Sequence, residues 1–140
     1  MPIKLPIYFL ARAVGLFALC RLLTRSRIRI LAYHGACLGD ESNYNPRLFI
    51  SAEVFKRRIT WLLKKRFNVI SLERAAIALA GSGDAGPFPT VVTFDDGWHS
   101  TAERLIPVLA ETGLPSTLYL CTSHFEEGWP VPAVAVNYMI

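Results

Sequence analysis

The sequence predicts an α/β fold, a parallel sheet or an α/β barrel, preceded by an apolar helix that carries basic residues. Four short apolar runs typical of strands alternate with helical patterns between residues 28 and 121. Strands that are buried on both faces and joined by helices form parallel sheets or barrels. The 140 residues suffice for about one domain, and a hydrophobic content of 52% excludes intrinsic disorder. We expect residues 1–27 to form the N-terminal helix and residues 28–140 to form the domain.

The N-terminal segment is apolar from Leu5 to Leu23 except for Arg12 and Arg21. A spanning helix needs about 20 apolar residues, and a central Arg costs about 2.5–3.5 kcal/mol on insertion scales. The residues after Cys20 do not resemble the small-residue cleavage site of a signal peptide. We therefore expect one helix over residues 5–23 whose two arginines stay in water. Its apolar face would lie on a membrane surface or on the body of the protein, and both readings remain open.

The charge of the chain is concentrated at this end. Residues 1–29 carry all of their charge as Lys and Arg, with no acidic residue, whereas the remainder is nearly neutral. A nucleic-acid-binding protein is expected to spread basic residues, interleaved with aromatic ones, over a docking face. The sequence does not show this pattern, so we expect no nucleic-acid partner.

The first half of the domain begins with a strand-like run over residues 28–33 that ends at His34. Gly, Asp, Asn and Pro residues predict a loop over 36–50. Ser51 is a candidate N-cap for a helix that runs to about residue 66. Four apolar residues of that helix are expected on its buried face: Phe55, Ile59, Leu62 and Leu63.

A second strand, over residues 67–72, and a short Ala-rich helix, over about 73–80, follow. Gly81 is suited to end this helix in the left-handed conformation. The next strand, over residues 90–94, is continuously apolar apart from its threonines and stops at two aspartates and a glycine.

The last predicted helix runs from Ser100 to Thr112. Ser100 and Glu103 have the spacing of a capping box. Pro107 lies inside this helix and is expected to bend it or to shift its hydrogen bonds. A fourth strand is predicted over residues 116–121.

Polar residues follow three of the four predicted strands. His34 follows the first, Asp95 and Asp96 follow the third, and His124 lies shortly after the fourth. Ligands bind at the carboxyl ends of the strands in parallel α/β folds. One aspartate of an adjacent pair could handle a proton while the other binds a metal. Asp-Asp-Gly is equally ordinary turn chemistry, so both interpretations stay open on the residues alone.

The segment Thr93-Phe94-Asp95-Asp96-Gly97 resembles the first motif of the polysaccharide deacetylase family, the chitooligosaccharide deacetylase-like enzymes of the NodB homology type. The flanking segments are similar as well: ILAYHG at residues 30–35, the helix and strand over 55–72, and the helix, turn and strand over 107–117. The similarity extends over about residues 28–124. It implies that the fold is the N-terminal part of a distorted (β/α) barrel.

The resemblance also implies roles for individual residues. Asp95 matches the catalytic base, and Asp96 matches a ligand of a divalent metal, usually zinc. His34 and His124 match no family motif, but their positions at predicted strand ends make them candidates for lining the site. The family takes two further metal ligands from a later histidine pair, and the histidines of this sequence (His34, His99 and His124) do not have that spacing. We therefore expect zinc binding by these 140 residues to be weak or absent.

The activity implied by the family is metal-dependent hydrolysis of N-acetyl groups on hexosamine polymers or oligomers. Because the later motif is missing, we expect this activity to be incomplete in the present chain. Two alternatives remain: a non-catalytic deacetylase-like domain of the cell envelope that binds a glycan or a partner, and another metal-dependent amidohydrolase.

Overall fold

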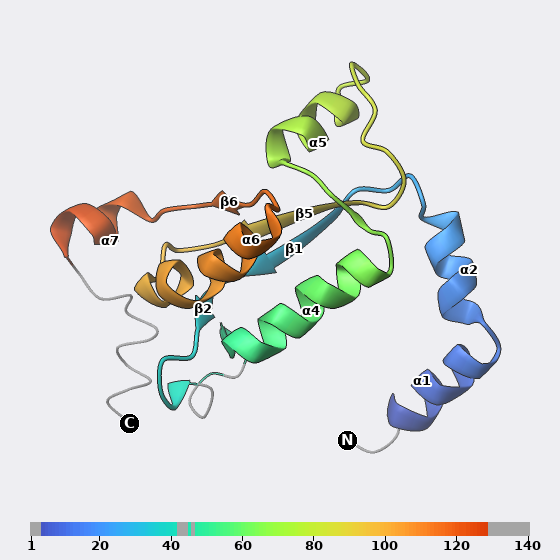
Figure 1. Ribbon diagram of the computed structural model, residues 1–140, viewed down its shortest axis with the longest axis horizontal. Helices are drawn as coiled ribbons and strands as arrows, with labels where there is room; N and C mark the ends of the chain where they lie inside the picture. Colours follow the sequence, from blue (N-terminus) through green and yellow to red (C-terminus); the bar gives the residue numbers. More distant parts are fainter. Residues whose placement is uncertain (1–3, 42–44, 46, 129–140) are drawn as a thin grey trace.

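The computed structural model describes residues 4–41, 45 and 47–128, and Figure 1 shows a twisted sheet with helices on both faces. The strands of the main sheet are β1 (Arg29–Tyr33), β4 (Asn68–Val69), β5 (Pro89–Phe94) and β6 (Thr117–Leu118). Strand β5 lies between β1 on one side and β4 and β6 on the other, and all of these pairs are parallel. The predicted parallel α/β fold is confirmed, with the second and fourth strands shorter than the apolar runs suggested.

The six residues of β5 are all buried, which explains their continuous apolar character. Successive side chains of a strand point to opposite faces. Val92 and Phe94 therefore pack against helix α4 (Ala52–Lys64) and helix α6 (Ile106–Thr112), whereas Val91 packs on the side of helix α5 (Leu72–Leu79).

Helix α4 begins where the sequence predicts. The Ser51 hydroxyl accepts a hydrogen bond from the Val54 N–H at 3.3 Å, as expected for an N-cap. Phe55, Ile59 and Leu62 are buried on the sheet. Leu63 was expected on the same face, but it is 42% exposed because it lies about 100° further round the helix than Leu62.

The helix before α6 differs from a regular α-helix. Residues Thr101–Leu105 form one π-helical turn, η1, in which the Ile106 N–H donates to the Thr101 carbonyl. Pro107 has no N–H to continue the α-helical ladder, so the predicted shift in hydrogen bonding is confirmed. The predicted capping box does not form: Ser100 makes no side-chain cap bond, because its hydroxyl accepts from the Ala36 N–H at 3.0 Å.

Two further expectations are corrected. The predicted loop over residues 36–50 contributes to two short strands, β2 (Gly35–Ala36) and β3 (Phe49–Ile50), which pair in parallel. The single helix expected over residues 5–23 is two helices, α1 (Lys4–Ala13) and α2 (Leu16–Leu23), bent by 70°. The break occurs at Gly15, which adopts the left-handed conformation with φ of 72°.

Within the described residues, neither α1 nor α2 is long enough to cross a membrane alone. Together, the two helices of the bent pair have the length and the apolar composition of a broken membrane span. The last helix, α7 (Thr122–Glu127), follows β6. Residues 129–140 lie outside the described part of the chain.

Candidate functional site at the carboxyl edge of the sheet

Asp95 directly follows the buried strand β5. Its backbone N–H donates to the Tyr33 carbonyl at 2.8 Å, which extends the pairing of β5 with β1 by one residue. The Asp95 side chain is 34% exposed. The fold therefore places this carboxylate at the carboxyl edge of the sheet with access to solvent, as the sequence predicts.

Asp96 and Gly97 turn the chain away from the sheet. Both have left-handed backbone angles, with φ of 69° and 72°. Asp tolerates this conformation better than most residues. Gly97 has a second reason to be glycine, because a Cβ at this position would lie only 2.4 Å from Leu120 Cδ2. The Asp96 carboxylate accepts a hydrogen bond from Trp98 Nε1 at 3.2 Å. Asp96 thus has a structural role in the turn, whatever else it binds.

His34 comes from the end of β1 and faces Asp95. The distance from His34 Nε2 to Asp95 Oδ2 is 3.9 Å, longer than a hydrogen bond but within the range of an ion pair when the imidazole is protonated. The His34 side chain is 35% exposed. The structure thus brings together two of the residues selected from the sequence.

Ser100 and Thr101 fix the end of β1, a role that the sequence alone does not indicate. Thr101 Oγ1 donates to the His34 carbonyl at 2.6 Å, and Ser100 Oγ accepts from the Ala36 N–H. Both threonine and serine are buried. These bonds tie the strand that carries His34 to the segment that follows Asp95-Asp96-Gly97. The signal available in the sequence was a polar pair just after the motif, which helix capping also explains.

The other histidines lie elsewhere. His99 pairs with Glu103, at 3.4 Å from Nε2 to Oε2, on the surface, where its side chain is 84% exposed. His124 belongs to the first turn of α7, and its side chain lies outside the described residues. The prediction that His124 lines the site therefore stays a prediction.

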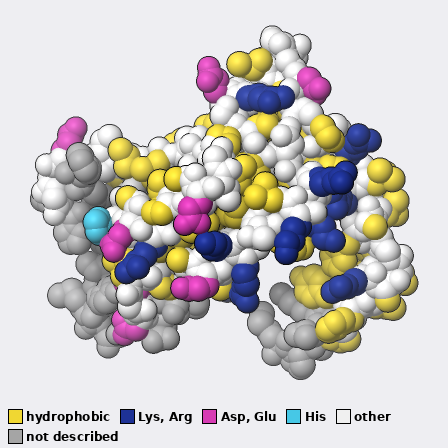
Figure 2. All heavy atoms as spheres, viewed as in Figure 1, with side chains coloured by type: hydrophobic (Ala, Val, Ile, Leu, Met, Phe, Trp, Pro, Cys, Tyr) yellow, Lys and Arg dark blue, Asp and Glu magenta, His cyan; other side chains and the backbone are white. Residues whose placement is uncertain are grey.

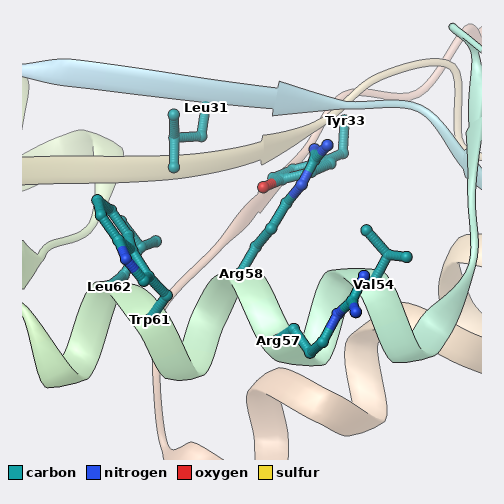
Figure 3. Close-up of a pocket in the computed structure, with 7 residues that line it drawn as sticks. All are labelled: Leu31, Tyr33, Val54, Arg57, Arg58, Trp61 and Leu62. Carbon is teal, nitrogen blue, oxygen red and sulfur yellow. The ribbon is translucent and has the colours of Figure 1, made fainter. Parts of the chain in front are cut away.

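Two hollows lie beside β1. His34 and Phe49 help to line one of about 330 Å³. A larger one, of about 520 Å³, lies between β1 and α4, where Trp61 and Arg58 reach from the helix toward Leu31 and Tyr33 (Figure 3). Asp95 lines neither hollow, so cavity size does not mark the place where the motif carboxylates lie.

The described residues do not supply a complete metal site. Catalytic zinc sites use about three protein ligands. No cluster of three His, Cys, Asp or Glu side chains suited to a metal occurs among residues 4–41, 45 and 47–128. The donor set at this edge does not fit a resident zinc ion, and we assign no reaction step to one.

The turn allows a stability prediction. Asp96→Ala should lower the free energy of unfolding by about 1–2 kcal/mol, because Ala in the left-handed conformation is strained and the bond from Trp98 is lost. Asp96→Asn keeps an acceptor oxygen and tolerates this backbone, so we expect a change below about 0.5 kcal/mol. Urea unfolding of the two variants measures the difference; equal stabilities would contradict the turn role.

Comparison with known proteins gives a consistent result. Residues 82–135, which include the Asp95-Asp96-Gly97 segment, match the family model of polysaccharide deacetylase. The chain is 22% identical over 95 residues to YxkH of Bacillus subtilis (strain 168), which is named as a polysaccharide deacetylase. This match covers 68% of the chain and 32% of YxkH.

Solved structures share the fold. IcaB from Ammonifex degensii is 25% identical with a TM-score of 0.59, and the match covers 66% of this chain and 37% of IcaB. The de-N-acetylase from Aggregatibacter actinomycetemcomitans is 26% identical with a TM-score of 0.60, with 69% and 38% covered. The Streptococcus pyogenes deacetylase PplD, solved with acetate, supports the fold at 23% identity and a TM-score of 0.64, with 75% and 47% covered.

The resemblance inferred from the sequence is thereby confirmed over about two thirds of the chain. The chain spans between about a third and a half of the length of these relatives.

Proposed function

We propose that this chain, a relative of the polysaccharide deacetylases, takes part in the hydrolysis of N-acetyl groups on hexosamine polymers or oligomers, with Asp95 as the general base. One observation carries the proposal: the Asp95 carboxylate lies at the carboxyl end of β5, beside His34 from β1, within a segment that matches the family.

The chemistry assigned to Asp95 is proton abstraction. Hydrolysis adds water across the amide: the water oxygen bonds to the acetyl carbon and the carbon–nitrogen bond breaks. The sugar nitrogen takes up the proton that the water loses and leaves as an amine. A carboxylate that is ionised at neutral pH and within reach of the attacking water accepts the proton that this water loses. The Asp95 side chain is 34% exposed at the edge of the sheet, so water can reach it.

His34 supports this role by position. An imidazole 3.9 Å from a carboxylate oxygen restricts the orientations of that carboxylate when the ring is protonated and attracts its negative charge. The bond from Thr101 to the His34 carbonyl holds the backbone of the histidine in place. We propose His34 as a positioning residue for Asp95.

Asp96 is proposed as a metal ligand within a site that needs further donors. The family places zinc at such a site, and the described residues supply fewer than three donors for it. We infer that metal binding and turnover are incomplete in these 140 residues. Adding the family's later histidine pair in an extended chain should complete both.

This inference gives a prediction for metal content. The purified 140-residue chain, equilibrated with equimolar zinc and then dialysed, should retain well below one zinc per chain, because a site with fewer than three protein ligands binds zinc weakly. Elemental analysis measures the ratio. Stoichiometric zinc that survives dialysis would show that the donors are already present.

A second candidate function is glycan or partner binding without catalysis. The hydrogen bond from Trp98 to Asp96 favours it, since that bond gives Asp96 a structural purpose that needs no metal.

The experiment that separates the candidates is acetate release from N-acetylated chitooligosaccharides by an extended chain that carries the later histidine pair. The hydrolase proposal predicts acetate and free amine in equal amounts. Oligosaccharide binding without acetate release would contradict it and support the second candidate. Release from small acetamides but not from oligosaccharides would instead indicate another amidohydrolase.

A further inference from the structure

Helices α1 and α2 expose an unusual amount of apolar surface. Ten large apolar side chains of this segment are between 47% and 72% exposed: Ile7, Tyr8, Phe9, Leu10, Val14, Leu16, Phe17, Leu19, Leu22 and Leu23. No residue of α2 is buried. Large exposed apolar patches of this kind mark sites of interaction with another protein or with a membrane.

The charge of the same segment identifies the partner. Every charged residue among residues 1–29 is basic: Lys4, Arg12, Arg21, Arg25, Arg27 and Arg29. Figure 2 shows basic and hydrophobic side chains interspersed over α1 and α2. Exposed apolar side chains with basic residues and no acidic ones are complementary to a bilayer surface that contains anionic lipid.

Arg21 joins α2 to the body, and only part of its side chain stays in water as expected. Its guanidinium carbon lies 5.0 Å from the centre of the Phe67 ring and 4.5 Å from that of Phe88, and its Nη2 donates to the Lys65 carbonyl. Its Nε atom is buried. Planar contact of a guanidinium with aromatic rings is favourable, and more so when it is desolvated.

The backbone strengthens this joint. The Phe88 N–H donates to the Arg25 carbonyl at 2.7 Å, just beyond α2. Phe88 itself has a φ of 53°, which is strained for an aromatic residue. Such strain persists only where surrounding contacts compensate for it, and here the strained residue carries the ring that Arg21 touches.

The joint lies at the end of the sheet opposite to the candidate site. Phe88 immediately precedes β5, and Arg29 is the first residue of β1, whereas His34 and Asp95 follow the last residues of the same two strands. Figure 1 shows α2 beside the amino ends of these strands. Strands of five and six residues separate the two ends by about 16–20 Å.

We propose that α1 and α2 bind the surface of a bilayer containing anionic lipid. The contacts of Arg21 with Phe67, Phe88 and Lys65, the Arg21 joint, hold α2 at the amino edge of the sheet. The bilayer would then lie at that edge, and Asp95 would face away from it. The part of the proposal that concerns the substrate rests on the proposed function: with Asp95 as the base, the polymer would lie off the membrane. The binding to the bilayer and the orientation of the sheet do not depend on the role of Asp95.

Vesicle co-sedimentation of the full chain tests the binding. We expect binding to phosphatidylcholine vesicles that contain about 30% phosphatidylglycerol, and weaker binding to phosphatidylcholine alone or at high salt. Phe9→Ser with Phe17→Ser should reduce binding at least about tenfold without affecting the core, because both side chains are exposed.

The contribution of charge is tested separately. Arg12→Gln with Arg27→Gln should reduce binding to anionic vesicles. Arg47→Gln with Arg104→Gln makes the same change of charge away from α1 and α2 and should leave this binding unchanged.

The native cysteines test the orientation. Cys20 lies exposed on α2, and Cys121 lies partly exposed after β6, near the opposite edge. In single-cysteine variants labelled with an environment-sensitive fluorophore, anionic vesicles should shift the emission of the Cys20 label to the blue and leave that of the Cys121 label unchanged. Equal shifts for both labels would overturn the orientation.

Arg21→Ala tests the joint separately. The variant should still bind vesicles, but spin labels at Cys20 and Cys121 should report a broader distance distribution than in the parent. An unchanged distribution would show that Arg21 does not hold α2.

Three outcomes would overturn the binding proposal itself. The first is absence of vesicle binding, and the second is self-association that covers the apolar side chains and prevents binding. The third is a bound chain that only detergent removes, which would indicate a broken span in place of surface attachment.

Discussion

Asp95→Asn is expected to lower the rate of acetate release by about 10²–10⁴-fold in an extended chain that carries the later histidine pair. Asn has nearly the same shape as Asp, but it cannot accept a proton from water at neutral pH. The backbone bond from the Asp95 N–H to the Tyr33 carbonyl does not involve the side chain, so the variant should fold normally.

The separate effects of Asp95→Asn on kcat and KM are as informative as the size of the loss of activity. A residue that acts on the reacting water should lower kcat with little effect on KM. Asp84→Asn is the matched control, because it makes the same chemical change in the loop before β5, far from the carboxyl edge. Equal losses in the two variants would point to a general effect of charge and would contradict the role of Asp95.

Phe55→Ala should have the largest effect on stability, lowering the free energy of unfolding by about 3–5 kcal/mol. Phe55 is fully buried on α4. Its ring meets that of Tyr33 edge-on at 4.9 Å between centroids and lies 5.8 Å from that of Phe94. These contacts join α4 to the two strands that carry the site, so the cavity would form at the centre of the core.

Leu63→Ala on the same helix is the comparison. Leu63 is 42% exposed, and we expect its substitution to cost less than about 1 kcal/mol. Denaturant unfolding of both variants measures the difference. Similar costs would mean that α4 presents a different face to the sheet.

The parallel sheet was predictable from the sequence because burial on both faces leaves a local mark. Strand β5 is buried at every position, and its apolar run stands out without knowledge of its neighbours. Ser51 and Gly81 were predictable for a similar reason. Ser51 caps the start of α4 and Gly81 adopts the left-handed conformation just after α5, so each acts within a few residues of its own helix.

Long-range partners were not predictable in the same way. The Ser100 hydroxyl had a local use as a helix cap, but it bonds to Ala36, 64 residues away. The sequence around Arg21 predicts a solvent-exposed side chain, but in the fold its guanidinium lies against the rings of Phe67 and Phe88. Strands β2 and β3 have two residues each, too few for a periodic pattern.

The candidate site shows the same division. The position of Asp95 follows from the strand that precedes it, and its motif is visible in the sequence. The approach of His34 to Asp95 depends on the parallel register of β1 and β5, in which Tyr33 pairs with Phe94. Both strands therefore end together, and only the fold shows this.

The most direct test of the assignment measures metal content and acetate release on the same preparations of the extended chain. We expect Asp95→Asn to keep its zinc and lose turnover, and Asp96→Asn to lose zinc and turnover together. Acetate release at the parental rate from both variants would contradict the assignment of this edge of the sheet as the active site.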